Sequence, residues 1–402
     1  ENNKPEFAGE WVRLGDVVEA SFAGEWGLET GEVLTPVLRT ANFNDDGTLD
    51  YATPAMRNIP RVKVSRKALR RGDIILEKSG GTPNRPVGIM AYYESDDVAL
   101  CSNFNQVLRI DCSLSDSRYM FYQLCWLRER GAFAPLSRKT TGLQNLQMSK
   151  FGDLQVKCPA KLVQRARAES LYQIQQLVRD GKALINRLDD LVKSQFIEMF
   201  GTLEEPRSGI ELKTIDSICT SIVRGPFGSA LKKEYFVPWH PGVYKVYEQK
   251  NAIRKQADIG DYYIEEAKFG ELGRFECVPG DILMSCSGTM GELYQLPNDA
   301  VPGVINQALC KFTLDSKQIL APYFLEIMSQ AVGELGAKGS GIQNIASVKY
   351  VKAVRIPVPP VELQRQFADL VARVDKLGFD CYREIVCCSV LFSSMSASLL
   401  CT

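Results

Sequence analysis

The chain has 402 residues, which exceeds one ordinary domain and predicts two or three hydrophobic cores. Hydrophobic residues make up 45% and charged residues 24%, which is typical of a globular protein and excludes a largely disordered chain. Its 48 basic and 48 acidic residues leave no net charge. This balance argues against a non-specific polyanion binder, although local basic patches can still attract phosphate.

Short apolar runs and amphipathic stretches alternate along the chain. In both halves the runs that are entered through glycine predict buried strands, and the stretches with apolar residues at helical spacing predict helices. The expected strands are Asp73–Leu76, Val107–Ile110, Asp281–Met284 and Leu309–Phe312, and the expected helices are Ser117–Arg128 and Ala321–Val332. Each half is therefore predicted to be a mixed α+β domain that is followed by a long helix.

The long helices carry apolar residues at alternating three- and four-residue spacing, as in a coiled coil. If the first helix runs from Ala160 to Glu198, it spans roughly 55 Å. The predicted pairing residues are Ile174, Leu177, Leu184, Leu188 and Leu191 in the first helix and Leu363, Phe367, Leu370, Val374 and Leu377 in the second. Each helix could pack only on its own domain, but two matching helices favour an antiparallel coiled coil that separates the two domains.

The chain also aligns with itself at an offset of about two hundred residues, drifting between 199 and 208. Several blocks match in the same order, and the drift is what loop insertions within a shared fold produce. The matching blocks are Val12–Val18 with Leu212–Ile218, Arg71–Leu76 with Pro279–Met284, Asn105–Leu108 with Asn306–Leu309, Thr141–Leu146 with Ser340–Ile345, and Cys158–Ala160 with Val358–Pro360. This order predicts two copies of one domain in tandem.

The cysteine and histidine content indicates whether the chain can hold a metal ion or form disulfides. The twelve cysteines are scattered without a Cys-x-x-Cys pair, and His240 is the single histidine, so we expect no metal site and reduced thiols in a cytoplasmic protein. The first residues carry no signal-peptide pattern. Residues 385–402 lack charge but are rich in serine, which favours a packed or frayed terminal segment over a membrane helix.

Common catalytic constellations are missing from the sequence. It contains no phosphate-binding loop, no His-Glu-x-x-His zinc motif and no Gly-x-Ser-x-Gly nucleophile elbow. A single histidine excludes most Ser-His-Asp and Cys-His arrangements, and His240 is interpreted as an ordinary loop residue. We therefore name no catalytic residue and expect any catalysis to belong to a partner.

Basic and polar residues gather in loops between the matching strands. Lys and Arg suit phosphate, and Arg, Lys, Asn and Gln suit base edges, so these loops are candidates for DNA binding even though a charge run is usually only a solvated face. The candidates are Lys78, Ser79, Asn84, Arg85, Arg138, Lys139, Thr140, Arg224, Phe227, Ser229, Lys232, Lys233, Lys250, Asn251, Ser287, Thr289 and Lys338.

A Gly-x-Gln-Asn turn recurs in both copies while the surrounding loops differ. Its amides are Gln144 and Asn145 in the first copy and Gln343 and Asn344 in the second. These side chains either brace the turn internally or lie close to DNA. The recurrence slightly favours bracing, so the loops that differ are the better candidates for reading sequence.

With these blocks in hand, the chain resembles the specificity subunits of type I restriction–modification systems. The likeness covers about residues 11 to 378, and its order is more telling than any one motif. It is carried by Leu212–Ile218, Gly225–Lys233, Gly280–Leu283, Ile305–Gln307, Gly341–Asn344, Ile356–Gln364 and the first-copy segment Glu77–Gly88.

The resemblance implies two target-recognition domains, each reading one half of a split DNA target, separated by paired helices. It also implies methyltransferase subunits docked along the helices and a translocating nuclease subunit, with S-adenosylmethionine and ATP/Mg bound by those partners and no cofactor bound by this chain. The expected domains are 1–158 and 201–357, with helical spacers at 159–200 and 358–402. After Leu377 the sequence departs from the family, because Gly378 leads into a cysteine- and serine-rich tail instead of a recognisable second half of the helix.

Two other functions remain open at the level of sequence. The chain could be an assembly scaffold that binds only proteins through its helices, without reading DNA sequence. A free-standing enzyme would require methylation or cleavage by the purified chain alone. Deletion of the loop Arg224–Lys233 distinguishes a DNA reader from a scaffold, because it should alter one half-site of a DNA reader and leave a scaffold's assembly unchanged.

Overall fold

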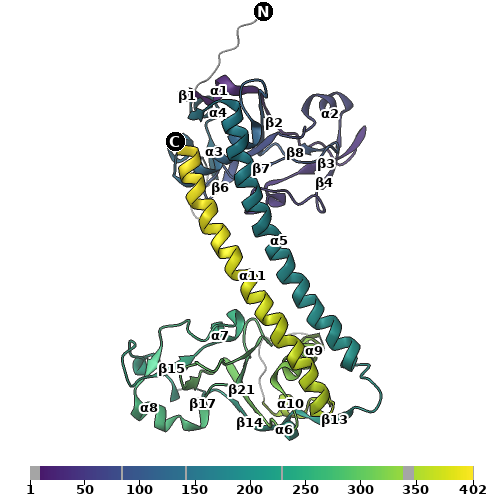
Figure 1. Ribbon diagram of the computed structural model, residues 1–402, viewed down its shortest axis with the longest axis vertical. Coiled ribbons are helices and arrows are strands. Elements are labelled where there is room, and N and C mark those ends of the chain that lie inside the picture. Colours follow the sequence, from purple (N-terminus) through teal and green to yellow (C-terminus); the bar gives the residue numbers. More distant parts are fainter. Residues whose placement is uncertain (1–9, 83–84, 141–142, 228–229, 338–347, 402) are drawn as a thin grey trace, which may run out of the picture. The chain divides into compact units, whose positions relative to one another are not determined.

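The computed structural model describes residues 10–82, 85–140, 143–227, 230–337 and 348–401, which form two compact units (Figure 1). The first unit contains Glu1–Ala183 together with Tyr382–Thr402, and the second is the continuous stretch Leu184–Cys381. Each long helix therefore contributes one end to each unit.

A four-stranded antiparallel sheet lies at the centre of the first unit, in the order β2-β9-β5-β7. The strands are β2 (Val18–Ala23), β9 (Asn105–Ile110), β5 (Ile74–Glu77) and β7 (Met90–Tyr92). Every residue of β5 is buried, as its run of apolar residues predicts. Helix α3 (Ser117–Glu129) begins with Asp116 as its N-cap, whose carboxylate accepts a hydrogen bond from the Tyr119 amide, and it packs into the same core.

The central sheet of the second unit has the same order, β14-β21-β18-β19. Its strands are β14 (Cys219–Arg224), β21 (Leu309–Leu314), β18 (Ile282–Ser285) and β19 (Leu293–Gln295), and α9 (Ala321–Ala337) takes the place of α3. The prediction that one domain occurs twice is confirmed for the four strands of the central sheet and for the helix that follows them.

Each unit also has a second sheet with one parallel pair. In the first unit this sheet is β4 (Ala55–Ile59), β3 (Val33–Leu38) and β8 (Leu100–Cys101), and β3 runs parallel to β8. In the second unit it is β16 (Tyr263–Ile264), β15 (Tyr244–Tyr247), β20 (Gly303–Ile305) and β17 (Glu276–Cys277), and β15 runs parallel to β20. The second sheets share this parallel pair but differ in their connecting segments.

Short elements complete each unit and lead into the long helices. Strand β1 (Glu10–Arg13) pairs with β12 (Gln155–Cys158), and β13 (Glu211–Thr214) pairs with β22 (Arg355–Val358). The short helices of the described residues are η1 (Thr40–Asn42), α1 (Leu14–Val17), α2 (Arg61–Lys67), η2 (Ala134–Leu136), α4 (Met148–Phe151), α6 (Ile215–Ile218), η4 (Lys233–Tyr235), α7 (Gln249–Arg254), α8 (Glu266–Glu271), η5 (Gly273–Phe275) and α10 (Val348–Ala353).

A buried ion pair joins equivalent strands in both units. Arg109 Nη2 lies 2.7 Å from Asp73 Oδ2, and Lys311 Nζ lies 3.3 Å from Asp281 Oδ2. In each pair the basic side chain is 11% exposed and the carboxylate 1%. The aspartate of the repeated Gly-Asp-Ile block therefore anchors the central sheet, since a buried charge requires a close partner.

The long helices begin in the same way. Gln164 lies in the first turn of α5 (Lys161–Phe200), and Gln364 lies in the first turn of α11 (Val361–Cys401). Both side chains are completely buried. Gln164 donates to the Pro159 carbonyl and accepts from Ser115 Oγ and the Asp116 amide. Gln364 likewise donates to the Pro359 carbonyl and accepts from the Leu320 amide, so each glutamine fastens its helix to its domain.

The tail that departs from the family pattern is helical. Helix α11 continues through Gly378 to Cys401 without interruption, so its 41 residues match the 40 residues of α5. In the first unit Phe392, Met395 and Leu400 pack against the hydrophobic core. The serine-rich composition is accommodated because Ser389 Oγ and Ser393 Oγ donate to carbonyls four residues earlier, at Ile385 and Ser389.

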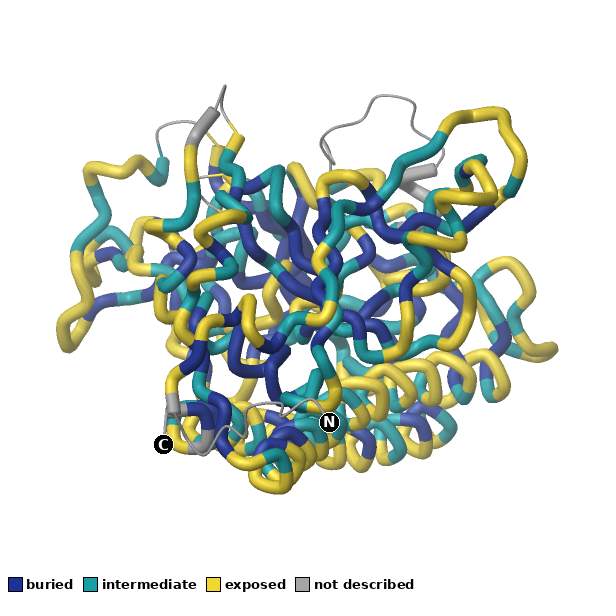
Figure 2. The backbone as a smooth tube through the Cα atoms, turned by 90° about the horizontal axis from the view of Figure 1, so that it is seen from above, coloured by how far each residue is buried: buried dark blue, intermediate teal, exposed yellow. Residues whose placement is uncertain are grey.

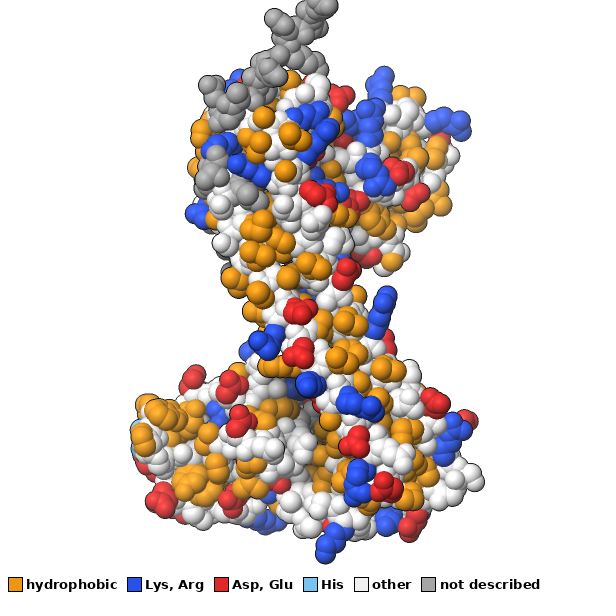
Figure 3. Space-filling model, in the orientation of Figure 1, with side chains coloured by type: hydrophobic (Ala, Val, Ile, Leu, Met, Phe, Trp, Pro, Cys, Tyr) orange, Lys and Arg blue, Asp and Glu red, His pale blue; other side chains and the backbone are white. Residues whose placement is uncertain are grey.

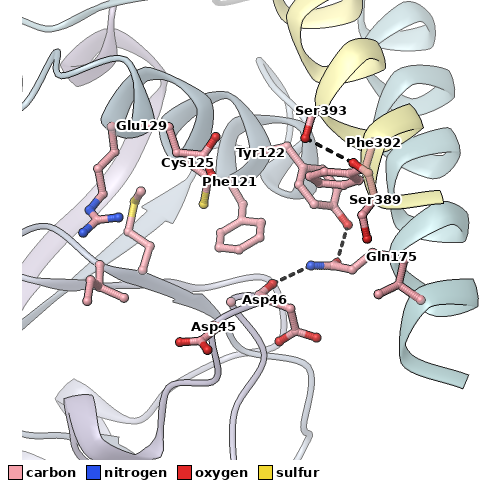
Figure 4. Close-up of a pocket in the computed structure, with 15 residues that line it drawn as sticks. Asp45, Asp46, Phe121, Tyr122, Cys125, Glu129, Gln175, Ser389, Phe392 and Ser393 are labelled. Carbon is pink, nitrogen blue, oxygen red and sulfur yellow. Dashed lines mark hydrogen bonds between the residues drawn. The ribbon is translucent and has the colours of Figure 1, made fainter. Parts of the chain in front are cut away.

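The end of α11 meets α3 and α5 inside the first unit (Figure 4). The Tyr122 and Phe392 rings make an edge contact with centroids 5.9 Å apart. Tyr122 Oη donates to Gln175 Oε1 over 2.9 Å, and Gln175 in turn donates to the Asp46 carbonyl. These contacts border a cavity of about 300 Å³.

In the second unit the end of α5 meets the start of α11 through a cluster of aromatic rings. Phe196 and Phe200 contact Phe367 with centroid distances of 5.4 and 5.7 Å, and Tyr323 of α9 packs against both α5 rings. Opposite ends of the helices thus meet in the two units, which defines an antiparallel pair. The predicted fold class, two α+β domains with long antiparallel helices, is confirmed.

The predicted helix seam is wrong at four positions. Leu177, Leu184, Leu191 and Leu377 are 60%, 48%, 46% and 58% exposed. Ile174, Phe367 and Val374 are buried, and Leu188, Leu363 and Leu370 are half-buried. The buried side of α5 also runs through Gln164 and Ala168, which a search for large apolar residues does not detect. Figure 2 shows exposed residues recurring along the turns of the long helices.

No helix among the described residues is long and apolar enough to cross a membrane. In the same part of the chain, no group of three or more His, Cys, Asp or Glu side chains is arranged to hold a metal ion.

Candidate nucleic-acid interface

A small three-stranded sheet gathers the candidate residues of the first unit. Strand β11 (Leu143–Leu146) lies between β6 (Ser79–Gly81) and β10 (Ser137–Thr140). Asn145 is opposite Ser79 on one side and Arg138 on the other. Segments separated by about sixty residues in the sequence therefore form one surface, which carries hydroxyl, amide and guanidinium groups.

Lys78 and Arg85 flank this sheet. Lys78 Nζ donates to Gln106 Oε1 over 3.4 Å, and burial lowers the pKa of the Lys78 ammonium. The Arg85 side chain is 53% exposed, and its Nη1 lies 3.9 Å from Glu77 Oε1. Arg85 is therefore positioned at the surface with its guanidinium available to a ligand.

Glu77 is a residue that the sequence interpretation did not select. Its side chain is only 3% exposed, at the end of β5, and the amides of Gly88 and Ile89 and the guanidinium groups of Arg85 and Arg128 interact with its carboxylate. Burial nevertheless dominates and raises the pKa of Glu77. Glu77 thus lies beneath the loop that carries the candidate residues and fixes its two ends.

Glu77→Gln is expected to reduce the loss of stability with rising pH. Because the pKa of Glu77 in the folded state is raised above its ordinary value of 4.5, the folded state binds the proton more tightly than the unfolded state does. The carboxyl group therefore costs stability as pH rises from about 4.5 through the folded pKa, and the cost persists above it. Glutamine stays neutral, so the variant should lose less stability between pH 4.5 and 8 in chemical unfolding. An unchanged pH dependence would contradict this assignment.

The structure describes only part of the Gly-x-Gln-Asn turns. Gln144 Oε1 accepts a hydrogen bond from the Val87 amide over 3.5 Å, which supports the bracing interpretation for this residue. Several predicted residues lie outside the described residues, namely Asn84, Ser229, Lys338, Gln343 and Asn344, and the side chains of Lys139 and Thr140 are likewise not described.

In the second unit the candidate cluster joins α7 to the loop after β18. Gln249 donates through Nε2 to the carbonyls of Ser287 and Thr289, and Ser287 Oγ donates to Gln249 Oε1 over 3.1 Å. The Thr289 side chain is exposed. Gln249 was not selected from the sequence, since its bonding partners lie almost forty residues away.

Two neighbouring predictions on α7 have different outcomes. Lys250 is partly exposed and lies 2.7 Å from Glu248 Oε2 and 5.6 Å from the Tyr262 ring centroid. Asn251 is completely buried, and its amide donates to the carbonyls of Gln256 and Ile259. Asn251 is therefore corrected from a candidate ligand contact to a capping and loop-bracing residue.

Arg224 ends β14 beneath an exposed ring. Its side chain donates to the Gln307 carbonyl over 3.4 Å, and its guanidinium lies 5.1 Å from the Phe227 ring centroid. Phe227 is 63% exposed, whereas Arg224 is 8% exposed. Lys232 pairs with Glu234 over 3.5 Å, and Lys233 lies beside it with an exposed side chain. At this edge Phe227, Lys232 and Lys233 are all exposed, and Arg224 lies against the Phe227 ring.

The two clusters occupy equivalent places in the repeat. Lys78 and Ser79 follow β5, and Ser287 and Thr289 follow β18. The last residue of each strand braces the loop that follows it, through Glu77 in the first unit and through Ser285, whose Oγ donates to the Thr289 carbonyl, in the second. The two repeats thus define a class of duplicated protein with one polar, partly basic cluster at the same position in each copy.

Comparisons with known proteins agree with this class. Residues 208–384 match the family described as the type I restriction modification DNA specificity domain. A search of curated proteins found no match. Residues 208–384 of this chain are therefore similar to the DNA specificity domain of type I restriction–modification systems, in agreement with the resemblance noted in the sequence.

Two solved structures share the fold across the whole chain. One is the S subunit of a type I restriction–modification system from M. genitalium, with a TM-score of 0.59 and 17% identity, and the match covers 100% of this chain and 97% of that one. The other comes from work on complex assembly and conformational transition of the type I R-M system, with a TM-score of 0.58, 15% identity and coverage of 100% and 99%. At this low sequence identity, the two matches show that the fold is shared and nothing more.

Proposed function

We propose that each repeat reads one half of a bipartite duplex DNA target. The observation that carries the proposal is the equivalent placement of the two clusters, after β5 and after β18, on different loop sequences. Equivalent placement gives the chain two similar DNA-binding surfaces, and their different side chains would recognise two different half-sites. Dimeric DNA-binding proteins address paired half-sites on the same principle, with one reader on each chain.

The groups in each cluster suit this role. Lys78 and Lys233 can neutralise phosphates, while Arg85, Arg138, Asn145 and Thr289 offer hydrogen-bonding groups for base edges. The chain has no net charge, so binding would depend on these local groups more than on a general attraction to polyanions.

The exposed sides of the long helices would hold the partner subunits. On α5, Leu177, Leu184 and Leu191 recur every seven residues and are each at least 46% exposed. On α11, Val386, Val390 and Leu391 are 44%, 65% and 47% exposed. Exposed apolar stripes are typical of protein interfaces, so we assign them to methyltransferase subunits, with a restriction subunit in the same assembly. S-adenosylmethionine and ATP/Mg would be bound by those partners.

The central experiment is a footprint of the chain together with its methyltransferase partner on duplex DNA. We expect two protected segments separated by an unprotected or less specific gap. A continuous footprint, or one that does not depend on DNA sequence, would refute bipartite reading. The scaffold alternative predicts assembly with the partner and no sequence-selective protection, and deletion of Arg224–Lys233 would then change nothing on DNA.

Arg85→Ala is expected to weaken recognition of one half-site only. Loss of a good base contact should reduce discrimination at that half-site by about 1–3 kcal/mol, measured as the ratio of affinities for matched and mismatched targets. Arg13→Ala is the matched control, because Arg13 is 57% exposed in the same unit but pairs with Asp153 away from the cluster. If Arg85→Ala instead weakens binding equally for all DNA sequences, Arg85 contacts phosphate rather than a base.

A further inference from the structure

An aromatic hollow of about 610 Å³ opens beside the candidate interface of the second unit. The residues that matter are Lys233, Phe236, Trp239, Asp261, Tyr262 and Tyr263, and we call this set the aromatic hollow. Hydrophobic side chains gather over the β15–α8 part of this unit in Figure 3. Trp239 is 67% exposed and Tyr262 is 36% exposed, which is unusual for rings of this size in one place.

The walls of the hollow are held firmly. The Val237 amide donates to the Tyr263 carbonyl over 2.9 Å, so the segment that carries Trp239 is attached to the edge strand β16. The Phe236 and Tyr262 rings are stacked at 4.5 Å with an interplanar angle of 24°. His240 Nε2 lies 3.1 Å from Glu265 Oε1, which fixes the chain directly after Trp239. The rings are thus positioned before any ligand binds.

We propose that the aromatic hollow binds an unpaired nucleobase that carries a phosphate. The exposed Trp239 ring offers a face on which any base can stack, and such stacking is tolerant of sequence. The Asp261 carboxylate can accept hydrogen bonds from the N–H groups of a base, and the Lys233 ammonium can pair with the phosphate. None of the ion pairs found among the described residues engages Lys233 or Asp261.

Continuity with the candidate interface favours a nucleotide over a protein partner. Lys233 belongs to both sites, and Lys250, on the other candidate segment, lies over the Tyr262 ring. A paired base presents only its edge in a duplex groove, whereas a stacking face requires a base that has left the helix or a nucleotide free in solution. The site therefore goes beyond the proposed reading of paired half-sites.

Tryptophan fluorescence of the full chain provides the test, and no bipartite target or partner subunit is needed. The ligands are short single-stranded DNA, a blunt duplex of the same sequence, and dGMP. We expect single-stranded DNA to quench the emission and the duplex to leave it almost unchanged. Binding of dGMP as tight as that of the strand would assign the site to free nucleotides, and weaker binding of dGMP would assign it to unpaired DNA. Either outcome supports a nucleobase site.

Variants decide whether the signal comes from the hollow. Trp239→Ala should weaken binding of a labelled single strand at least fivefold, the lower end of the effect of removing a stacking ring, whereas Trp11→Ala, another exposed tryptophan, should not. Lys233→Gln should weaken binding more at low salt than at high salt. Unchanged single-strand affinity in Trp239→Ala, or equal quenching by the blunt duplex, would overturn the proposal. Because the assay lacks the bipartite target, a failure here leaves the proposed half-site reading untouched.

Discussion

Replacing Phe367 by alanine is expected to lower the free energy of unfolding of the second unit by about 3–5 kcal/mol. The Phe367 ring is fully buried and contacts Phe196 and Phe200, so its removal leaves a cavity where α5 and α11 meet. Chemical unfolding, followed by a probe in the second unit, measures the change.

Phe379→Ala is the matched control for this substitution. Phe379 lies on the same helix, in the same unit, and is 63% exposed. Its replacement should change stability by less than about 0.5 kcal/mol, as surface substitutions usually do. Equal destabilisation by the two variants would show that the aromatic cluster does not hold the helices together.

Arg109→Met is expected to destabilise the first unit by about 3–5 kcal/mol, because it leaves the buried Asp73 carboxylate without its cation. Arg71→Met is the control, since Arg71 pairs with Asp96 through side chains that are 57% and 78% exposed, and such solvent-exposed pairs add little to stability. Thermal unfolding of the three proteins compares the two pairs.

Arg109→Lys separates the role of the charge from the geometry of the guanidinium. The second unit uses Lys311 opposite Asp281 at the equivalent position, so a lysine can satisfy this carboxylate. The variant should therefore recover most of the stability that methionine loses, although it gives up the contact between Arg109 and the Ala68 carbonyl. Recovery of none of the loss would contradict a mainly electrostatic role.

The fold could be predicted from the sequence to a large extent because the repeated sequence blocks are mostly residues that become buried in the core. The repeated Gly-Asp-Ile blocks became β5 and β18, and the repeated Asn-Gln blocks became the start of β9 and the turn before β21. Positions of this kind depend on local pattern and burial, which the sequence displays directly. The helix seam was harder, because polar and small residues, such as Gln164 and Ala168, share the buried face with leucines.

The candidate sites could be predicted less well, because their geometry depends on distant partners. The buried Glu77 and the bridging Gln249 are polar residues whose roles depend on groups that only the fold brings close. Asn251 has a residue type suited to base edges, but its amide is used entirely inside the protein. Residue type indicates what a side chain can bind, and burial decides whether it is available.

The first unit is assembled from two separate stretches of chain, whereas the second is a single stretch. During synthesis on a ribosome, the core around Tyr122 and Leu171 therefore lacks Phe392, Met395 and Leu400 until the last part of α11 has been translated. The second unit needs only the earlier part of α11, which carries Phe367, and should acquire its protease resistance first, which limited digestion of stalled nascent chains can measure. The order of maturation would thus be the reverse of the order along the chain.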